Sequence, residues 1–76
     1  MVKTEWETQR IIEAGWRVWF YHDGVPYSGY VQKINDDQTF KIAVYYINNI
    51  ALGKYKILDE IHRLDIYQWE IKRRKT

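Results

Sequence analysis

Few residues of this sequence have the types and spacing that catalysis or metal binding requires. His22 stands beside Asp23, and His62 has an aspartate three residues away on either side. Metal sites usually need three or four convergent ligands, and the chain has no cysteine and no H-E-x-x-H pattern. Ser28 is the single serine and has no neighbouring base. We therefore expect no enzyme activity, no metal and no cofactor.

Aromatic residues are the stronger candidates for recognition. The chain has 4 Trp, 7 Tyr and 2 Phe, which make up 17% of its 76 residues, and a domain of this size has a small interior. We expect Phe20, Phe40 and one of Tyr45 and Tyr46 to pack in the core, and strand alternation to leave other rings partly exposed. Exposed rings can stack on bases or hold a peptide. The predicted ligand-binding residues are Trp19, Tyr21, His22, Tyr27, Tyr45 and Tyr46.

Charge is distributed unevenly along the chain. Residues 1–70 carry 8 Lys or Arg and 10 Asp or Glu, so the net charge of +2 comes from the basic tail, residues 72–76. Lysine and arginine bind phosphates and release counterions, so the tail is a candidate nucleic-acid contact; it is also typical of a solvated terminus. The nearly neutral remainder favours a protein ligand. The candidate phosphate contacts are Lys72, Arg73, Arg74 and Lys75.

The first fifteen residues predict a short helix and its cap. Thr4 and Glu7 have the spacing of a capping box, in which each side chain accepts a hydrogen bond from the backbone N–H of the other residue. Gly15 follows at the position where a helix often ends in a left-handed residue. We expect a helix over residues 4–14.

The rest of the chain has the pattern of short strands separated by turns. Strands are predicted over residues 16–22, 28–34, 39–47, 55–58 and 65–71. Turns or loops are predicted over 23–26, 35–38 and 48–54, and residues 59–64 fit either a helical turn or a strand crossing. These elements predict a mainly β fold, a small SH3-like barrel of about five strands that spans residues 16–71.

Part of this region resembles Tudor-like domains of the chromo-barrel (Tudor-knot) type. Residues 18–31 read VWFYHDGVPYSGYV and resemble the opening strands of that family. Later matches are Val44-Tyr45-Tyr46, residues 58–61 and Arg63-Leu64, so that the resemblance covers about residues 15–67. It implies a module that binds a chromatin component such as a histone tail peptide.

Some chromo-barrels hold a methylated lysine in an aromatic cage through cation–π attraction. By position, the resemblance implies that the cage residues here are His22, Tyr27 and either Tyr46 or Tyr45. Two further cage walls are usually tryptophan in the family, and here those places hold Asn48-Asn49 and Ile61. Chromo-barrels with incomplete cages can bind nucleic acid instead.

Three functions are consistent with the sequence. The first is a chromo-barrel-like binding module for a histone peptide, the second a nucleic-acid-binding barrel that uses the rings and the basic tail, and the third a small protein–protein adaptor or inhibitor. No segment approaches the roughly 20 apolar residues of a membrane span. We therefore expect an intracellular protein without a membrane partner, nuclear if the chromatin resemblance holds and otherwise cytoplasmic.

Overall fold

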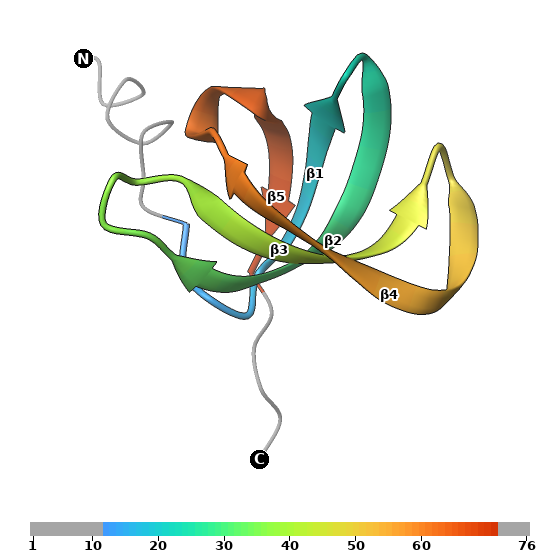
Figure 1. Ribbon diagram of the computed structural model, residues 1–76, viewed down its shortest axis with the longest axis horizontal. Coiled ribbons are helices and arrows are strands. Elements are labelled where there is room, and N and C mark those ends of the chain that lie inside the picture. The colour runs from blue at the N-terminus through green and yellow to red at the C-terminus, as the bar shows by residue number, and fades with distance from the viewer. Residues whose placement is uncertain (1–11, 72–76) are drawn as a thin grey trace.

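The computed structural model describes residues 12–71, and five antiparallel strands account for most of them (Figure 1). The strands are β1 (Arg17–His22), β2 (Val25–Ile34), β3 (Phe40–Ile47), β4 (Ile50–Ile61) and β5 (Ile66–Glu70). Their order across the sheet is β4-β3-β2-β1-β5, so β1 to β4 form a meander and β5 returns to pair with β1. The predicted mainly β fold with five strands is confirmed.

Two tight turns connect strands of the meander. Asp23 and Gly24 join β1 to β2 with φ values of 56° and 79°, and Asn48 and Asn49 join β3 to β4 with φ values of 55° and 67°. Two-residue hairpin loops with positive φ at both positions match the twist of the flanking strands. The predicted loop over residues 48–54 is therefore wrong, because the chain reverses within Asn48-Asn49 and β4 already begins at Ile50.

The turn between β2 and β3 is held by polar side chains, as predicted for residues 35–38. The backbone N–H of Asn35 donates to the Thr39 carbonyl oxygen at 2.9 Å. Asp37 Oδ1 accepts from both the backbone N–H and the hydroxyl of Thr39, at 3.1 Å and 2.6 Å. Aspartate in a turn commonly binds the backbone two residues on in this way.

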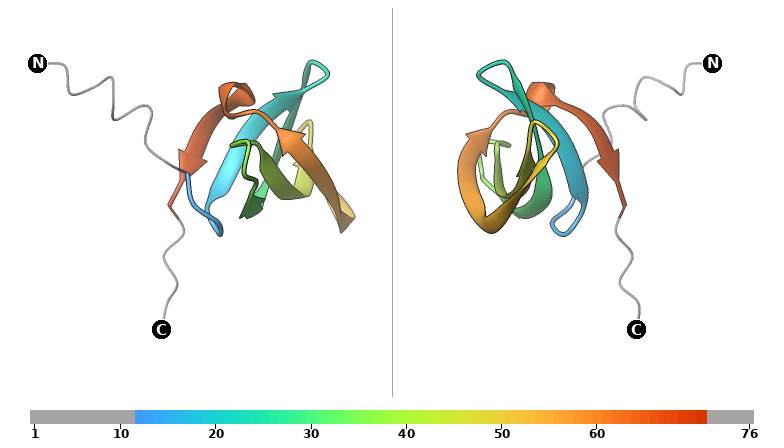
Figure 2. Two further views of the ribbon diagram at one scale, coloured as in Figure 1. Left: turned by 60° about the vertical axis from the view of Figure 1, so that its left-hand side comes forward. Right: turned by 90° about the vertical axis from the view of Figure 1, so that its right-hand side faces the viewer.

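The sheet is strongly bent, and irregular pairing accompanies the bend (Figure 2). The register shifts within the β1–β5, β2–β3 and β3–β4 pairs. At one shift, β2 comes so close to β3 that a Cβ atom on Gly29 would overlap the carbonyl oxygen of Ala43. Glycine at this position therefore permits the bulge and the close approach of the two strands.

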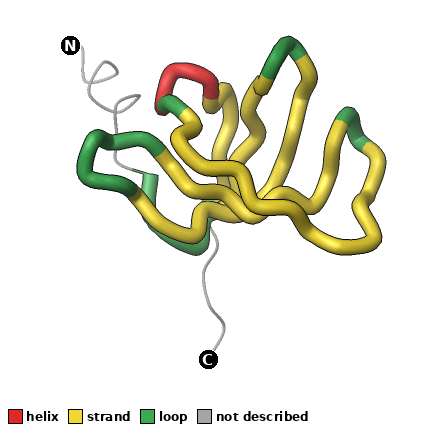
Figure 3. The backbone as a smooth tube through the Cα atoms, viewed as in Figure 1, coloured by secondary structure: helices red, strands yellow, loops and turns green. Residues whose placement is uncertain are grey.

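The ambiguous stretch over residues 59–64 is divided between two elements. β4 continues to Ile61, and the 3₁₀ helix η1 (Arg63–Asp65) follows it (Figure 3). Glu60 has a φ of 58° next to the register shift between β3 and β4, so an extra residue is accommodated there by a left-handed conformation. η1 then leads the chain into β5.

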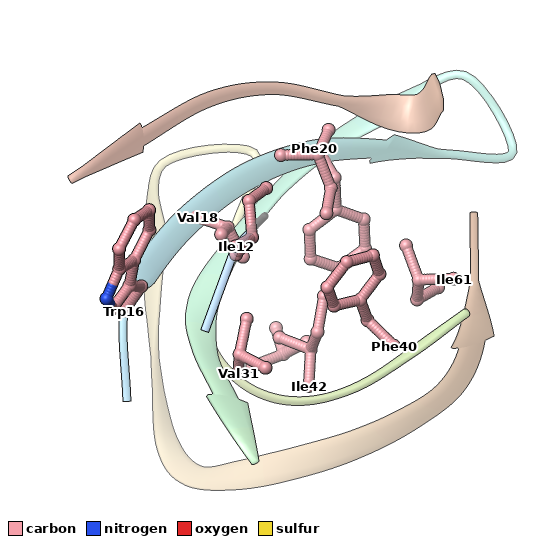
Figure 4. Close-up of a cluster of buried hydrophobic side chains, with 10 residues drawn as sticks. Ile12, Trp16, Val18, Phe20, Val31, Phe40, Ile42 and Ile61 are labelled. Carbon is pink, nitrogen blue, oxygen red and sulfur yellow. The ribbon is translucent and has the colours of Figure 1, made fainter. Parts of the chain in front are cut away.

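The core lies inside the curve of the sheet, where side chains from β1 and β3 point toward one another (Figure 4). Val18 and Phe20 are buried and alternate with residues of β1 that are partly exposed, as strand periodicity requires. The predicted burial of Phe20 and Phe40 is confirmed. The buried cluster comprises Ile12, Trp16, Val18, Phe20, Val31, Phe40, Ile42, Val44, Ile61 and Ile66.

The segment before β1 belongs to this core. Ile12 is 1% exposed and Trp16 is 8% exposed. The Gly15 N–H donates to Val31 O at 2.8 Å and the Val31 N–H donates to Trp16 O at 3.0 Å, so the segment pairs with β2. Gly15 has a φ of 94°, in the positive range expected for it.

The predicted N-terminal helix is not supported. Residues 4–11 lie outside the described residues, and residues 12–14 are not helical. The backbone turns at this point, where the Trp16 N–H donates to Glu13 O at 3.3 Å, and it then pairs with β2 in place of continuing a helix. The described residues contain no helix with the length and apolar character needed to cross a membrane.

Candidate binding surface

The sheet face turned away from the core carries a group of tyrosine and tryptophan side chains. Along β1 the residues that alternate with Val18 and Phe20 are Arg17, Trp19 and Tyr21, and they lie on this face. Pairing and ring contacts place further rings from the other four strands beside them. We call this group the outer aromatic face: Trp19, Tyr21, Tyr30, Tyr45, Tyr46, Tyr55 and Tyr67.

A bulge places two consecutive tyrosines on the outer aromatic face. Ser28 pairs with Tyr46 and Gly29 pairs with Val44, so Tyr45 is an extra residue in β3. Tyr45 is 41% exposed and Tyr46 is 40% exposed. The expectation that one of these two packs in the core is wrong, because the bulge interrupts the strict alternation from which it was derived.

The rings form two contact groups. Tyr45 meets Tyr30 edge-on at a centroid distance of 5.7 Å and stacks on Tyr55 at 5.5 Å with an interplanar angle of 11°. Tyr21 and Tyr67 lie 4.7 Å apart. These pairs connect β2, β3 and β4 on one side and β1 and β5 on the other, and their geometry is typical of favourable aromatic contacts.

An arginine packs against the two remaining rings of the face, Trp19 and Tyr46. The guanidinium carbon of Arg17 is 4.7 Å from the Trp19 ring centroid and 5.5 Å from that of Tyr46. Arg17 Nε also donates to Ser28 Oγ at 3.3 Å. Both rings lie within the roughly 6 Å range of cation–π attraction. The side chain of Arg17 is therefore fixed in place by contacts from three strands.

Two shallow hollows adjoin on this face, and Tyr46 lines both. The first lies where β1, β2, β5 and the β3–β4 turn meet, and the second lies over β2, β3 and β4. The first is lined by Trp19, Pro26, Tyr27, Ser28, Tyr46, Asn49 and Tyr67, and the second by Tyr30, Tyr45, Tyr46, Ala51 and Leu52. None of these lining residues is charged.

Two of the six predicted ligand-binding residues are not among the rings of the outer aromatic face, although Tyr27 also lines the first hollow. Tyr27 packs toward the core, with its ring centroid 5.5 Å from that of Phe20, and His22 meets Tyr27 edge-on at 5.4 Å. Trp19, Tyr21, Tyr45 and Tyr46 are brought together on the outer aromatic face. Of the positions carried over for a methyl-lysine cage, His22 and Tyr27 contact each other, and Tyr27 and Tyr46 both line the first hollow, whose volume is only about 10 Å³.

Other residues of the surface were not predicted as site residues. Arg17 stands two positions from Trp19 in a strand, and this period-2 spacing alone places both on one face. Tyr55 and Tyr67 lie next to register shifts in β4 and β5, where alternation gives no reliable face. Lys72, Arg73, Arg74 and Lys75 of the basic tail lie outside the described residues.

An acidic hollow occupies another part of the molecule, around the β2–β3 turn and the end of β4. The Thr39 hydroxyl donates to Asp37, which lowers the pKa of that carboxyl, and the Asn35 amide donates to Asp59 at 2.9 Å and lowers its pKa. No cluster within residues 12–71 has the geometry to hold a metal ion. The hollow is lined by Lys33, Asn35, Asp36, Asp37, Thr39, Asp59 and Glu60. Its hydrogen bonds stabilise the turn.

Comparisons of the chain with known protein families, with curated proteins and with solved structures gave no match.

Proposed function

We propose that this chain is a non-catalytic binding module of the SH3-like barrel class, and that its outer aromatic face binds a segment of another protein. The observation that carries the proposal is the group of seven rings gathered on one side of a sheet whose other side already forms the core. Contiguous exposed apolar surface on a small domain commonly marks an interaction site.

The composition of the face supports a protein ligand. Interface centres are enriched in tyrosine, tryptophan and arginine and poor in lysine and carboxylates. The hollows among the rings are lined by uncharged residues, and Arg17 packs beside them. A nucleic-acid surface would be expected to follow a basic groove, whereas residues 12–71 carry six Lys or Arg and eight Asp or Glu.

The barrel class is supported by connectivity and curvature. β5 pairs with β1 at one edge of the sheet, and only the short segment of residues 62–65 separates its start from the end of β4 at the other edge. A strongly bent five-stranded sheet with this connection is the arrangement that a small barrel requires. A histone tail is the ligand that the chromo-barrel resemblance implies, and it stays a prediction.

The arrangement of the cage positions affects how such a peptide would bind. His22 and Tyr27 contact each other, and the hollow that Tyr27 shares with Tyr46 has a volume of only about 10 Å³, too small for a methylated ammonium group. A cage needs rings that converge on one cation. We therefore place the peptide across the outer aromatic face, where side chains of the ligand contact rings from several strands.

The test is a selection from a random peptide library displayed on phage, with the folded chain as target, followed by NMR titration of the selected peptides. Histone-tail peptides with and without trimethyllysine, and single- and double-stranded oligonucleotides, are titrated in parallel. We expect selected peptides to shift backbone resonances of β1, β3 and β5 on the outer aromatic face, and Trp19→Ala or Tyr46→Ala to weaken binding at least about tenfold.

Leu64→Ala is the matched control, because Leu64 is 94% exposed and lies in η1, outside the face. It should leave binding unchanged. The proposal is wrong if selected peptides bind Trp19→Ala as well as the natural chain. It is also wrong if oligonucleotides shift these resonances and no peptide does, which would favour the nucleic-acid alternative.

A further inference from the structure

We propose that Arg17 is an anchor for a carboxylate, so that the outer aromatic face recognises a protein segment with an aspartate or glutamate flanked by apolar side chains. This inference rests on the proposed function, because it identifies the chemistry of the ligand at the same surface. It goes beyond that proposal in assigning one residue, one ligand group and a charge preference.

The first argument is the unused hydrogen-bonding capacity of Arg17. A guanidinium has five N–H donors. Nε donates to Ser28 Oγ at 3.3 Å, and within the described part of the chain no hydrogen bond or ion pair uses the two terminal nitrogens. These terminal nitrogens form the end of the fork that binds a carboxylate through two parallel hydrogen bonds.

The second argument is preorganisation. Arg17 is partly buried, and its guanidinium lies against the rings of Trp19 and Tyr46 while Ser28 fixes Nε. A long side chain normally loses rotamer entropy when it binds, and here contacts within the protein already restrict it. Rings beside a charge also exclude water, which strengthens its attraction to an opposite charge.

The third argument concerns the nearest carboxylate by register. Glu70 of β5 pairs with Arg17 across the sheet, yet the two side chains form no ion pair. Glu70 therefore does not occupy the terminal nitrogens of Arg17. The Glu70 carboxylate adds a negative charge near the site, and this charge repels an anionic ligand. Substitution of Glu70 therefore provides a second test.

The position of Arg17 beside uncharged hollows specifies the rest of the ligand. The hollow lined by Tyr30, Tyr45, Tyr46, Ala51 and Leu52 has a volume of about 410 Å³ and can accept an apolar side chain, and Arg17 contacts the ring of Tyr46 beside it. A carboxylate bound by Arg17 thus has apolar contacts within reach of its neighbours in the ligand chain. Electrostatic complementarity of this kind contributes specificity more than affinity.

The experiment follows the Nε–Hε resonance of Arg17 in ¹⁵N-labelled full chain at low salt. The probes are acetyl-Tyr-Glu-Tyr-amide and its neutral counterpart acetyl-Tyr-Gln-Tyr-amide, with a thymidine dodecamer as the nucleic-acid arm. We expect the glutamate peptide to shift this resonance and to bind about fivefold more tightly than the glutamine peptide. Added salt should reduce the difference.

Two substitutions of Arg17 distinguish the effect of its positive charge from the effect of its two-pronged guanidinium geometry. Arg17→Gln should bring the two peptides to within about twofold of each other, and Arg17→Lys should keep part of the preference because it retains the charge. Glu70→Gln should strengthen binding of the glutamate peptide and leave the glutamine peptide unchanged. Thermal melts of each variant establish that the fold is kept, and the measurement on the natural chain does not depend on them.

Three outcomes would overturn the inference: equal affinity for the two peptides, no movement of the Arg17 resonance with either peptide, or movement with the dodecamer alone. Failure of the inference differs from failure of the proposed function. If library-selected peptides bind the outer aromatic face and show no preference for a carboxylate, the proposed function is supported and the proposed role of Arg17 is wrong. If no peptide from the library binds this face, the function falls as well.

Discussion

The two faces of the sheet are formed by the same strands, but they differ in the types of side chain they carry and in how deeply these are buried. The inner face carries aliphatic residues and phenylalanine that are almost completely buried, such as Val18, Phe20 and Ile42. The outer face carries tyrosine and tryptophan, of which Tyr45 and Tyr46 keep about two fifths of their surface exposed. Substitutions should therefore separate stability, which depends on the inner face, from recognition, which depends on the outer one.

The close approach of β2 to β3 gives the largest expected effect. Gly29→Ala would place a Cβ atom against backbone atoms of Ala43 and Val44, and backbone in a sheet cannot move aside without separating the strands. A chain of this size is stable by only about 4 to 11 kcal/mol, so we expect Gly29→Ala to be unfolded by circular dichroism and by loss of dispersed amide resonances.

Gly53→Ala is the matched control for this prediction. Gly53 lies in the exposed part of β4, and an added Cβ atom would have open space around it, so stability should change by less than about 0.5 kcal/mol. A folded Gly29→Ala chain with unchanged thermal midpoint would show that the two strands are not held at the distance described.

The next effect compares one residue from each face of β3. Phe40 is 5% exposed and lies in the core, so Phe40→Ala should cost about 3 to 5 kcal/mol. Tyr45→Ala removes contacts with Tyr30 and Tyr55 on the outer face, and should cost about 1 kcal/mol. Urea unfolding followed by tryptophan fluorescence measures both. Equal costs would contradict the division of labour between the faces.

This division was partly predictable from the sequence. Period-2 alternation places Val18 and Phe20 on one face and Trp19 and Tyr21 on the other, and the structure agrees because β1 pairs with β2 in unbroken register from Arg17 to His22. Asp23-Gly24 was recognised as a turn from residue types that tolerate positive φ. Such features depend on the residues themselves and on their nearest neighbours along the chain.

Features that depend on the partner strand were not predictable in this way. The bulge that turns both Tyr45 and Tyr46 outward is defined by their pairing with Ser28 and Gly29. Ile12 enters the core because its segment pairs with the end of β2, and its surrounding sequence had suggested a helix. Local propensity is overridden where tertiary pairing offers more burial.

The β3–β4 turn fixes the register between β3 and β4. A shift of one residue in this register would exchange the inner and outer side chains of a strand. Asn49 has a φ of 67°. Asn49→Val forces a β-branched residue into this conformation and should cost about 1 to 2 kcal/mol in thermal or urea unfolding. Asn49→Gly keeps the conformation accessible and should be neutral or slightly stabilising. A tolerated valine would indicate that the turn has a different geometry.

The smallest expected effect comes from the acidic hollow, which lies apart from the outer aromatic face. The Thr39 hydroxyl holds the pKa of Asp37 below its usual value, and the Asn35 amide does the same for the pKa of Asp59. A lowered pKa in the folded state means that the unfolded chain binds protons more readily, so these carboxylates stabilise the fold above about pH 4 to 5. That contribution is lost as the pH falls through the lower pKa values of the folded state.

Asp37→Asn tests this with urea midpoints measured between pH 6 and pH 2.5. The variant should be slightly less stable than the natural chain at pH 6, and the difference should shrink towards pH 2.5, because the natural carboxyl is then protonated as well. Asp36→Asn is the control, since Thr39 donates its hydrogen bonds to Asp37. A pH-independent difference for Asp37→Asn would mean that the hydrogen bonds from Thr39 do not depend on the charge of Asp37.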